Sequence, residues 1–471
     1  METKEKRLVN NTIIFTIGSL GSKFIQFLLV PLYTYTLTAS QFGITEILLT
    51  AVNLLMPVFS ISIADGLLRF GLDKTLRREN VLKSAFIISI LGTILSIISI
   101  PIFSLYPTLS EWMVYFIIIL NLRMYRDVFA IQLKVEGKNT LFACDSMIYT
   151  FVLSLASIVF LVPFSLGISG YFFAYIVSNG ISIFFILFFG GVWKSFTSGR
   201  FEKQLMIQLL KYSAPMILNG IAWWITNASD RFMLQWFMDD RAVGLYGVVA
   251  KLPLLIGTFT GVFNQAWIIS AVEEFEEENE EWFYQKVFHQ YYAALFLSVS
   301  VFLLLLQPFM KVYVSPSFYE AWQYAPFLLL SSVVSGIAAF MTGFYVAQKK
   351  NLNIIYTTIA GAFANILLNA MFIPMLGVLG ASIATFLSWF VIAIYRMKDV
   401  ENFACFPLDK KVFWYLFLLC IQTITMTFLP ILGIVFSVVL IPYFFYQEQE
   451  FLAVLLVKGR KKVCSFKKSK R

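Results

Sequence analysis

The sequence predicts an all-α integral membrane protein, and three observations carry that prediction. Hydrophobic residues make up 59% of the 471 residues, and charged residues only 13%. The mean hydropathy of +0.78 is far above that of a soluble globular domain. The apolar residues come in runs of about 20, the length of a membrane-spanning helix, without the alternation typical of a membrane β-barrel. A soluble protein is therefore excluded.

Fourteen apolar runs predict about fourteen transmembrane helices. In chain order they cover residues 12–35, 42–64, 84–106, 112–133, 141–164, 171–192, 212–238, 243–270, 291–309, 324–347, 354–373, 378–397, 412–429 and 431–446. The last run has only 16 residues and contains Pro442. As a helix it spans about 24 Å, a little less than a typical bilayer core.

The distribution of lysine and arginine tests these spans independently, because positively charged loops stay in the cytoplasm. With fourteen spans, and with Arg396 at the inner end of its span counted as cytoplasmic, 29 of the 36 cations fall on one side, and only Arg241 and Lys311 fall on the other. The remaining five lie inside predicted spans. Both termini are basic, which requires an even number of spans, so both are expected in the cytoplasm. The basic tail at 458–471 is expected to anchor on anionic lipid and not to bind nucleic acid.

The two halves of the chain suggest a parallel internal repeat. Gly43 and Gly244 close the first outer turn of each half and are 201 residues apart. Six spans precede the basic loop around Arg200 and six follow it, so both halves have the same orientation. We expect an N-terminal lobe at 1–200, a C-terminal lobe at 201–400, two further spans at 401–457 and a cytoplasmic tail at 458–471.

Cysteine and histidine usage argues against cofactor chemistry. The four cysteines are scattered, with no CxxC pair, and His289 is the only histidine. Neither a disulfide framework nor a metal site is expected, and no cofactor is predicted. The sequence also lacks a GxxxxGK[ST] nucleotide-binding loop.

Ionisable residues inside a membrane span cost roughly 2.5–3.5 kcal/mol each, so each one needs a reason. Lys23 lies about 16 Å into the first span, near the middle of the bilayer, which favours a cavity-facing role. Arg123 and Arg126 share one face of the fourth span with Asp127 close by. For these arginines, snorkelling to the inner headgroups is as good an explanation as function.

The seventh and eighth spans carry a second group of charges. Asp230 and Arg231 fall in the outer half of the seventh span, and Lys251 lies about 12 Å into the eighth. An ion pair between the helices explains Asp230 with one cation but leaves the second cation unpaired. Glu46 is expected near the outer end of its span, where exposure costs little. Asp145, at the start of the fifth span, suits a helix N-terminus.

Ordered by depth, these cations form a ladder across the membrane. Arg69, Arg123 and Arg126 lie toward the inside, Lys23 in the middle, and Arg231 and Lys251 toward the outside. Arginine and lysine are the side chains that bind phosphate, so a phosphate or pyrophosphate headgroup is the simplest substrate. Asp127 and Asp230 are the candidates for ion coupling or for an ion pair.

Several motifs lie around these cations. In the first half they are Asn11-Thr12, Gly18-Ser19-Leu20-Gly21-Ser22-Lys23, Pro31-Leu32-Tyr33-Thr34, Gln41-Phe42-Gly43 and Gly66-Leu67-Leu68-Arg69-Phe70. In the second half they are Asp230-Arg231-Phe232-Met233-Leu234, Val243-Gly244-Leu245-Tyr246 and Ala250-Lys251-Leu252. With them the chain resembles the Wzx-type oligosaccharide flippases of polysaccharide biosynthesis, in the multidrug/oligosaccharidyl-lipid/polysaccharide (MOP) exporter superfamily.

The resemblance implies a MATE-like fold with two six-helix lobes around a cavity that opens alternately to each side. It implies an undecaprenyl-pyrophosphate-linked oligosaccharide as the substrate, moved from the inner to the outer leaflet of the bacterial cytoplasmic membrane. The polymerase and glycosyltransferases of the same pathway are the expected protein partners, besides membrane lipid. The motifs extend a pyrophosphate-binding role to Lys23, Arg69, Arg231 and Lys251, whereas Arg123 and Arg126 rest on the depth argument alone.

Two other functions remain as alternatives. A cation-coupled multidrug exporter of the same superfamily shares the expected fold, but the excess of cations within the spans argues against it. A membrane glycosyltransferase or polymerase needs a sizeable loop that carries carboxylates, and the outer loops here are short apart from residues 310–323. The sequence predicts a transporter and not an enzyme.

Overall fold

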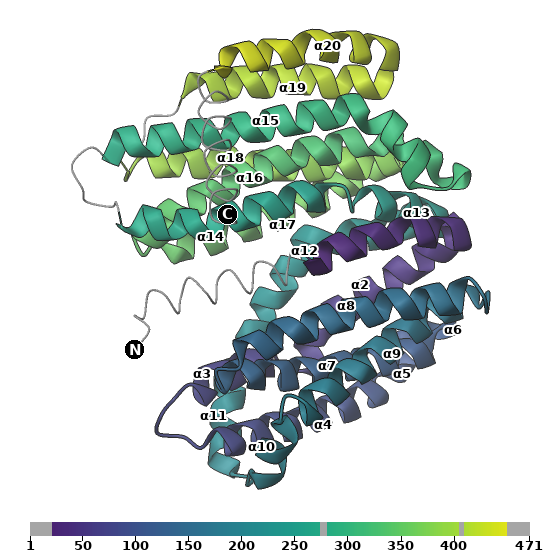
Figure 1. The fold of residues 1–471 in the computed structure, drawn as a ribbon, viewed down its shortest axis with the longest axis vertical. Coiled ribbons are helices and arrows are strands. Elements are labelled where there is room, and N and C mark those ends of the chain that lie inside the picture. Colours follow the sequence, from purple (N-terminus) through teal and green to yellow (C-terminus); the bar gives the residue numbers. More distant parts are fainter. Residues whose placement is uncertain (1–20, 274–279, 405–408, 450–471) are drawn as a thin grey trace, which may run out of the picture. The chain divides into compact units, whose positions relative to one another are not determined.

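Every element of the described chain is a helix (Figure 1). The computed structural model describes residues 21–273, 280–404 and 409–449. Outside these residues lie the start of the first predicted span (12–20), most of the acidic run at 273–281 and the whole basic tail at 458–471. The prediction of an all-α membrane fold is confirmed.

The described chain divides into two compact units, here named unit 1 and unit 2. Unit 1 contains the chain up to Lys251 together with the short segments Tyr313–Phe318 and Asn369–Val378. Unit 2 contains Leu252–Val312, Tyr319–Leu368 and the chain from Leu379 onward. The lobe boundaries predicted at residues 200 and 400 come from the sequence repeat, whereas the two units are defined by which segments pack together. The lobe boundaries therefore stay a prediction.

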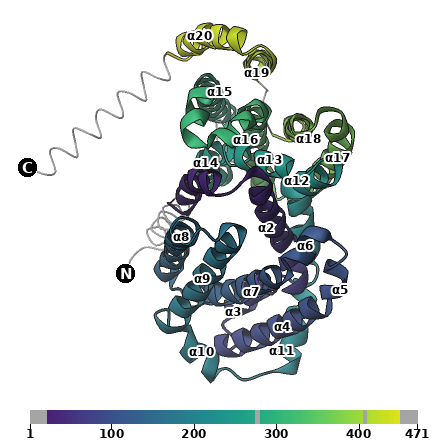
Figure 2. The same cartoon turned by 90° about the vertical axis from the view of Figure 1, so that its right-hand side faces the viewer.

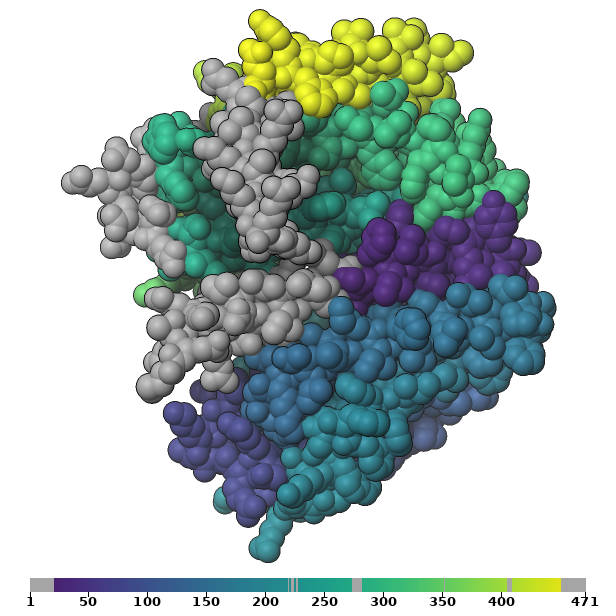
Figure 3. Space-filling model, viewed as in Figure 1, coloured from purple at the N-terminus to yellow at the C-terminus, as the bar shows by residue number. Residues whose placement is uncertain are grey.

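Unit 1 begins with a helix over residues 21–36. It continues with α2 (Ala39–Phe59), α3 (Ile63–Gly71), α4 (Arg78–Ile98), α5 (Ile100–Phe103), α6 (Pro107–Glu111), α7 (Met113–Val135), α8 (Asn139–Leu161), α9 (Gly167–Phe188), α10 (Val192–Ser198), α11 (Lys203–Ser213), α12 (Met216–Phe237) and α13 (Asp240–Val249). Its α8 and α9 pack side by side, seen in blue and teal in Figure 3, and α9 also contacts α7. Buried apolar side chains of α3, α4, α7, α9, α10 and α11 form a hydrophobic core.

Unit 2 contains α14 (Pro253–Glu273), α15 (Glu280–Tyr313), a 3₁₀ helix η1 (Pro316–Tyr324), α16 (Ala325–Ala347), α17 (Asn351–Leu376), α18 (Val378–Glu401), α19 (Lys410–Phe428) and α20 (Pro430–Gln447), except for the segments that belong to unit 1. The η1–α16 stretch is its central element, because 83% of its apolar window is buried. α16 contacts α14 and α19, and α19 pairs with α20 in a hairpin (Figure 2).

The α2 and α13 helices cross at glycines, in the register that the sequence repeat predicts. A Cβ atom on Gly43 would lie 1.8 Å from the Asp240 carbonyl oxygen, and one on Gly244 would lie 1.9 Å from the Ala39 carbonyl oxygen. Both pairs of equivalent residues, 43 with 244 and 39 with 240, are 201 residues apart. The contact is therefore reciprocal, as across a two-fold axis. Only glycine permits such close backbone approach.

The N-termini of these two helices follow the same register. Thr38 caps α2 in a capping box, in which its hydroxyl accepts from the Gln41 N–H at 3.2 Å. Asp239, 201 residues later, caps α13 and accepts from the Ala242 N–H at 2.8 Å. Each cap satisfies one N–H group that the first turn of a helix leaves open. Two sequences with little identity thus start a helix at equivalent positions.

Two predicted spans are not single helices. The span predicted at 42–64 breaks after Phe59, where Ile61 and Ser62 have φ of 54° and 48°, and α3 then starts. The span predicted at 243–270 breaks between Val249 and Pro253. Proline lacks the N–H that a continuing helix needs and disfavours helical backbone in the residue before it. The break places Lys251 outside either helix.

Eleven helical segments of the described chain are long and apolar enough to cross a membrane, which makes this a multi-pass membrane protein. They correspond to eleven of the fourteen predicted spans. The other three spans correspond to residues 21–36, which follow the undescribed first 20, and to α7 and α12, which do not meet that criterion. Hence the count of fourteen stays a prediction. The shortest predicted span coincides with α20, which has 18 residues.

Candidate functional site

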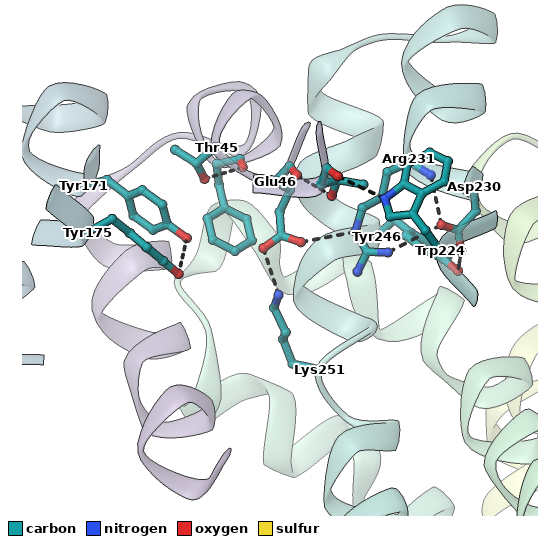
Figure 4. Close-up of polar contacts among 11 residues, drawn as sticks. Thr45, Glu46, Tyr171, Tyr175, Trp224, Asp230, Arg231, Tyr246 and Lys251 are labelled. Atoms are coloured by element: carbon teal, nitrogen blue, oxygen red, sulfur yellow. Dashed lines mark hydrogen bonds and ion pairs between the residues drawn. The ribbon is translucent and has the colours of Figure 1, made fainter. Parts of the chain in front are cut away.

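Glu46 is the centre of a buried ion-pair cluster in unit 1, which we name the Glu46 cluster and which includes Asp230, Arg231, Tyr246 and Lys251. The Glu46 carboxylate accepts from Lys251 Nζ at 2.8 Å and from Arg231 Nε at 3.2 Å. Glu46 itself is only 5% exposed. Figure 4 shows the carboxylate of α2 between the two cations, which come from α12 and from the break after α13.

Asp230 holds the other side of the Arg231 guanidinium. Its Oδ1 lies 3.4 Å from Arg231 Nη1 and also accepts from the Arg231 backbone N–H at 2.9 Å. The Tyr246 hydroxyl of α13 donates to the second oxygen of Asp230. Two carboxylates and two cations thus neutralise one another out of water, as buried charges must. The cluster connects α2, α12 and α13.

The local sequence makes room for this cluster. Gly247 faces Glu46, and a Cβ atom there would lie 2.8 Å from the Glu46 Cγ. Gly247 is also the repeat equivalent of Glu46, 201 residues later, so a single carboxylate occupies the region near the two-fold axis. α12 is fixed to α2 nearby, because the Trp224 indole N–H donates to the Thr50 carbonyl at 2.9 Å.

The expectation for Glu46 was wrong, and so was the expectation of an unpaired second cation. Glu46 is buried and not an exposed helix end, because α13 crosses α2 at Gly43 and covers it. Arg231 and Lys251 both have a partner, since Glu46 binds the two together. The sequence contains one signal for the buried position of Glu46. Its equivalent in the second half of the repeat is Gly247, a residue small enough to leave room for the Glu46 side chain.

Arg126 belongs to a second polar cluster, among α7, α8 and α9 of unit 1. Its Nη2 lies 2.8 Å from Asp145 Oδ2, and its Nε donates to the Ser182 hydroxyl at 2.6 Å. Ser182 in turn donates to the other oxygen of Asp145. The guanidinium also lies over the Tyr149 ring, 4.1 Å from the centroid. The fully buried Asp145 is thus an ion-pair partner and not only a favourable residue near a helix N-terminus.

The remaining predicted cations have different surroundings. Lys23 and Arg69 are exposed, and Arg123 and Asp127 are half-buried. Among the described residues, none of these four makes a hydrogen bond or an ion pair. Asp127 is therefore not the ion-pair partner of Arg126. Within the described part of the chain, Lys23, Arg69 and Arg123 are cations without a carboxylate in contact, whereas Arg126, Arg231 and Lys251 each have one.

Sequence reasoning also missed a buried cation in unit 2. Arg396 of α18 lies at the inner end of the span predicted at 378–397 and counts among the cytoplasmic cations there, yet it is only 5% exposed. Its guanidinium donates to neutral oxygens of α16 and α17: the Ala338 carbonyl at 3.1 Å and the hydroxyls of Thr357 at 3.0 Å and Thr342 at 3.2 Å. These bonds identify Arg396 as a structural link between three helices.

A third cluster, in unit 2, surrounds the single histidine; we name it the His289 cluster, with Tyr292, Asp409, Tyr415 and Glu448. His289 Nδ1 lies 3.2 Å from Asp409 Oδ2, and its Nε2 lies 2.9 Å from Glu448 Oε2. Tyr292 donates to Asp409, and Tyr415 donates to Glu448 at 2.8 Å. One imidazole thus connects α15 to both ends of the α19–α20 hairpin.

Asp409 lies in this cluster just before α19, outside the membrane-spanning segment. Burial raises the pKa of its carboxyl, but hydrogen bonds from Tyr292, the Lys411 N–H and His289 outweigh burial and lower the pKa below 3.8. Because the pKa of Asp409 is lower in the folded protein than in the unfolded chain, its ionised carboxylate stabilises the fold at any pH above the ordinary pKa. This stabilisation is lost as the pH falls through the lowered pKa. In the described residues, no three acidic, histidine or cysteine side chains are placed to hold a metal ion.

The family of the chain follows from a comparison with protein-family models. Residues 8–269 match the model of the polysaccharide biosynthesis protein family, which is more than half of the chain. The chain belongs to this family. The matched region contains all six predicted pyrophosphate-binding cations and the whole Glu46 cluster. The family resemblance that the motifs predict is confirmed.

Solved structures show the same fold. The lipid II flippase MurJ in an inward closed conformation matches with a TM-score of 0.71 at 13% identity, over 94% of this chain and 100% of that chain. An inward-facing multidrug resistance MATE family transporter of the MOP superfamily matches with a TM-score of 0.66 at 12% identity, over 81% of this chain and 95% of that one.

An outward-facing MATE family transporter of the same superfamily matches with a TM-score of 0.57 at 15% identity, over 84% of this chain and 95% of that one. A comparison with curated protein sequences found no match. At these identities the likeness shows the fold alone, and the predicted MATE-like fold is confirmed.

Proposed function

We propose that this membrane protein is a flippase that moves a polyprenyl-pyrophosphate-linked oligosaccharide from the inner to the outer leaflet. One observation carries the proposal: a single buried carboxylate, Glu46, is shared by two cations, Arg231 and Lys251. Each cation can bind a second anion, and a pyrophosphate offers several acceptor oxygens at once. Membership of the polysaccharide biosynthesis family supports a sugar-linked substrate.

The other cations suit the first contact with such a substrate. Lys23, Arg69 and Arg123 have no ion pair among the described residues, and each is exposed or half-buried. They lie from the predicted cytoplasmic side to the middle of the membrane. We infer that they bind the pyrophosphate as it enters from the inner leaflet. Arg126 is already engaged by Asp145 and Ser182, so binding there requires an exchange of partners.

Glu46 then acts as an internal competitor of the substrate. Glu46 is seven residues into α2, about 10 Å from the end predicted to face outward. Its bonds to Arg231 and Lys251 hold α2 against α12 and α13 near that end. A pyrophosphate that binds the same two cations replaces Glu46 and releases α2 from α13. Opening toward the outside is thus coupled to arrival of the anion, by differential binding to the two states.

No nucleotide is needed to drive this movement. A charge that crosses the membrane changes in free energy by about 2.3 kcal/mol per 100 mV. Export of roughly two negative charges from a negative interior is therefore favourable by about 4.6 kcal/mol at 100 mV. Asp127 and Asp230 remain the candidates for additional coupling to a proton or sodium ion.

Reconstitution of the full chain in lipid vesicles tests this function. The substrate is a polyprenyl-pyrophosphate oligosaccharide, and the measurement is its appearance in the opposite leaflet under an applied potential. Arg231→Gln and Lys251→Gln are expected to lower the rate at least tenfold. Lys74→Gln, which removes an exposed cation in the loop between α3 and α4, is the matched control and is expected to leave the rate unchanged.

The fold similarity to MATE transporters favours one competing function, a cation-coupled multidrug exporter. The same vesicles distinguish the two. Export of an organic cation without movement of the lipid-linked sugar establishes the exporter and overturns the flippase. Lipid transport that survives both substitutions, at equal amounts of folded protein, refutes the role of the two cations.

A further inference from the structure

A pocket lined by many hydroxyl-bearing residues lies at the end of unit 1 that carries the N-termini of α2 and α13. Its volume is about 450 Å³, within the range of small-molecule sites. Hydroxyl groups dominate its lining, which includes Tyr35, Thr36, Ser40 and Ser317 together with one cation, Arg241. The positive-inside count predicts that this end of the unit faces outward, on the side where only Arg241 and Lys311 are basic.

Three separate stretches of chain form the wall, and each is held by its own contacts. Residues 34–40 join the first helix to α2, and the capping box of Thr38 and Gln41 fixes their turn. The Tyr313 hydroxyl donates to the Phe27 carbonyl at 2.8 Å, and the two rings stack at 4.5 Å. This contact positions the short segment that carries Ser315 and Ser317.

Arg241 is positioned by the glycine crossing. It is the second residue of α13, and Gly43 and Gly244 hold that helix end against α2. Ser40, its repeat equivalent 201 residues earlier, lines the same pocket. The pocket is therefore built on the closely packed junction of α2 and α13 and not on an isolated loop.

The lining combines hydroxyl groups with apolar surface, which suits a ligand that both donates and accepts hydrogen bonds and also has apolar C–H faces. A serine or threonine hydroxyl does both, as sugar hydroxyls do, so the two surfaces can pair in many geometries. The Tyr35 side chain is 63% exposed and offers an aromatic face beside these groups. A guanidinium in such a setting recognises a carboxylate or phosphate in a bidentate manner.

We propose that this pocket binds an acidic sugar of the oligosaccharide headgroup as it emerges on the outer side. The direction of transport in this inference rests on the proposed function. The chemistry of binding rests only on the residues that line the pocket. Arg241 selects the acidic substituent, and the hydroxyl lining binds the sugar ring. The site favours release outward and makes the transporter selective for acidic repeat units.

Binding of soluble probes to the purified full chain tests the pocket without any transport step. The probes are glucuronate, glucose and inorganic phosphate, and the measurement is ligand-detected NMR or calorimetry. Glucuronate is expected to bind at least tenfold more tightly than either other probe. Arg241→Gln is expected to reduce glucuronate binding to the level of glucose, whereas Lys311→Gln, the other predicted outer cation, leaves it unchanged.

Equal binding of glucose and glucuronate, or no saturable binding of either, overturns the proposal. Binding of phosphate as tight as that of glucuronate shows a simple anion site and overturns it too. These outcomes are independent of the flippase assay. Transport by the wild-type protein that Arg231→Gln abolishes, together with no glucuronate binding, refutes the pocket alone. Saturable glucuronate binding without any transport of the lipid-linked sugar by the wild-type protein refutes the flippase alone.

Discussion

The Glu46 cluster and the His289 cluster have opposite stoichiometry. In unit 1, one carboxylate lies between two cations, and Asp230 completes the charge balance. In unit 2, one imidazole lies between two carboxylates, Asp409 and Glu448. Both clusters connect helices that are far apart in sequence. They differ in which charge is present in excess around the shared group.

This difference separates an exchangeable site from a structural one. The cations around Glu46 can accept another anion, so an anionic ligand can compete for them. The carboxylates around His289 already have a tyrosine hydroxyl each, and they repel an anion. We therefore expect ligand-dependent behaviour in unit 1 and constitutive helix docking in unit 2.

Removal of the shared carboxylate is the strongest way to break this comparison. Glu46→Gln leaves two cations around a neutral side chain in a buried site. Loss of one partner of a buried ion pair costs about 3 kcal/mol. A thermal unfolding experiment in detergent is expected to show a clear decrease in Tm. Added pyrophosphate is expected to restore part of the loss, because it supplies the missing negative charge.

The wild-type protein and Asp145→Asn are the controls for this experiment. Asp145→Asn also removes a buried carboxylate from an arginine, but it leaves the guanidinium on the Ser182 hydroxyl and the Tyr149 ring. Pyrophosphate is expected to give it no recovery. If Glu46→Gln is as stable as the wild type, the Glu46 cluster is not a closed ion-pair site.

Much of unit 1 was predictable from sequence, and the exceptions have a physical cause. Hydropathy located the helices, and depth in the spans identified Arg231 and Lys251 as functional candidates. The partner of both was not predictable, because Glu46 is 185 residues from Arg231 and 205 residues from Lys251. Local patterns do not contain such pairings. The one sequence feature that hints at the buried position of Glu46 is the repeat register, which makes Glu46 and Gly247 equivalent.

The two broken spans show the same limit. Pro253 is a local signal for a break, and it marks the start of α14 correctly. No local signal explains Ile61, a β-branched residue with φ of 54°, since side chains of this kind avoid left-handed backbone. Packing around α2 and α3 overrides the local preference there. Sequence patterns therefore predict that helices exist better than where they are interrupted.

A methyl group at the helix crossing is the second way to break the comparison. Gly43→Ala places a Cβ 1.8 Å from the Asp240 backbone oxygen, so α2 and α13 must separate. Overpacking of this kind costs about 2 kcal/mol. A lower Tm is expected, with faster amide hydrogen exchange in α2 and α13 and none of this effect in α19. Gly180→Ala is the control, because a Cβ there meets nothing within 4 Å.

The double variant Gly43→Ala, Gly244→Ala sharpens this test. The two glycines share one contact, so the second substitution costs less once the helices have separated. Strictly additive losses of stability contradict a reciprocal crossing at these residues.

The smallest effect is expected in the His289 cluster. His289→Gln removes the group between two carboxylates, although Tyr292 and Tyr415 remain bonded to them. Hydrogen bonds to charged groups contribute about 1.5 kcal/mol, so Tm is expected to fall by a few degrees. Hydrogen exchange is expected to increase in α19 and α20 but not in α2. Because the cluster is structural, the transport rate at equal amounts of folded protein is expected to stay that of the wild type.

A further substitution distinguishes charge balance from simple packing in this cluster. In His289→Gln, the carboxylates of Asp409 and Glu448 face each other without a cation between them. Glu448→Gln removes one of those charges, so adding it to His289→Gln is expected to recover part of the lost stability, whereas alone it destabilises. No recovery in the double variant means that the imidazole contributes through its shape and not through the charge between two carboxylates. In that case charge balance does not explain the stability of the His289 cluster, and the comparison of its charges with those of the Glu46 cluster fails.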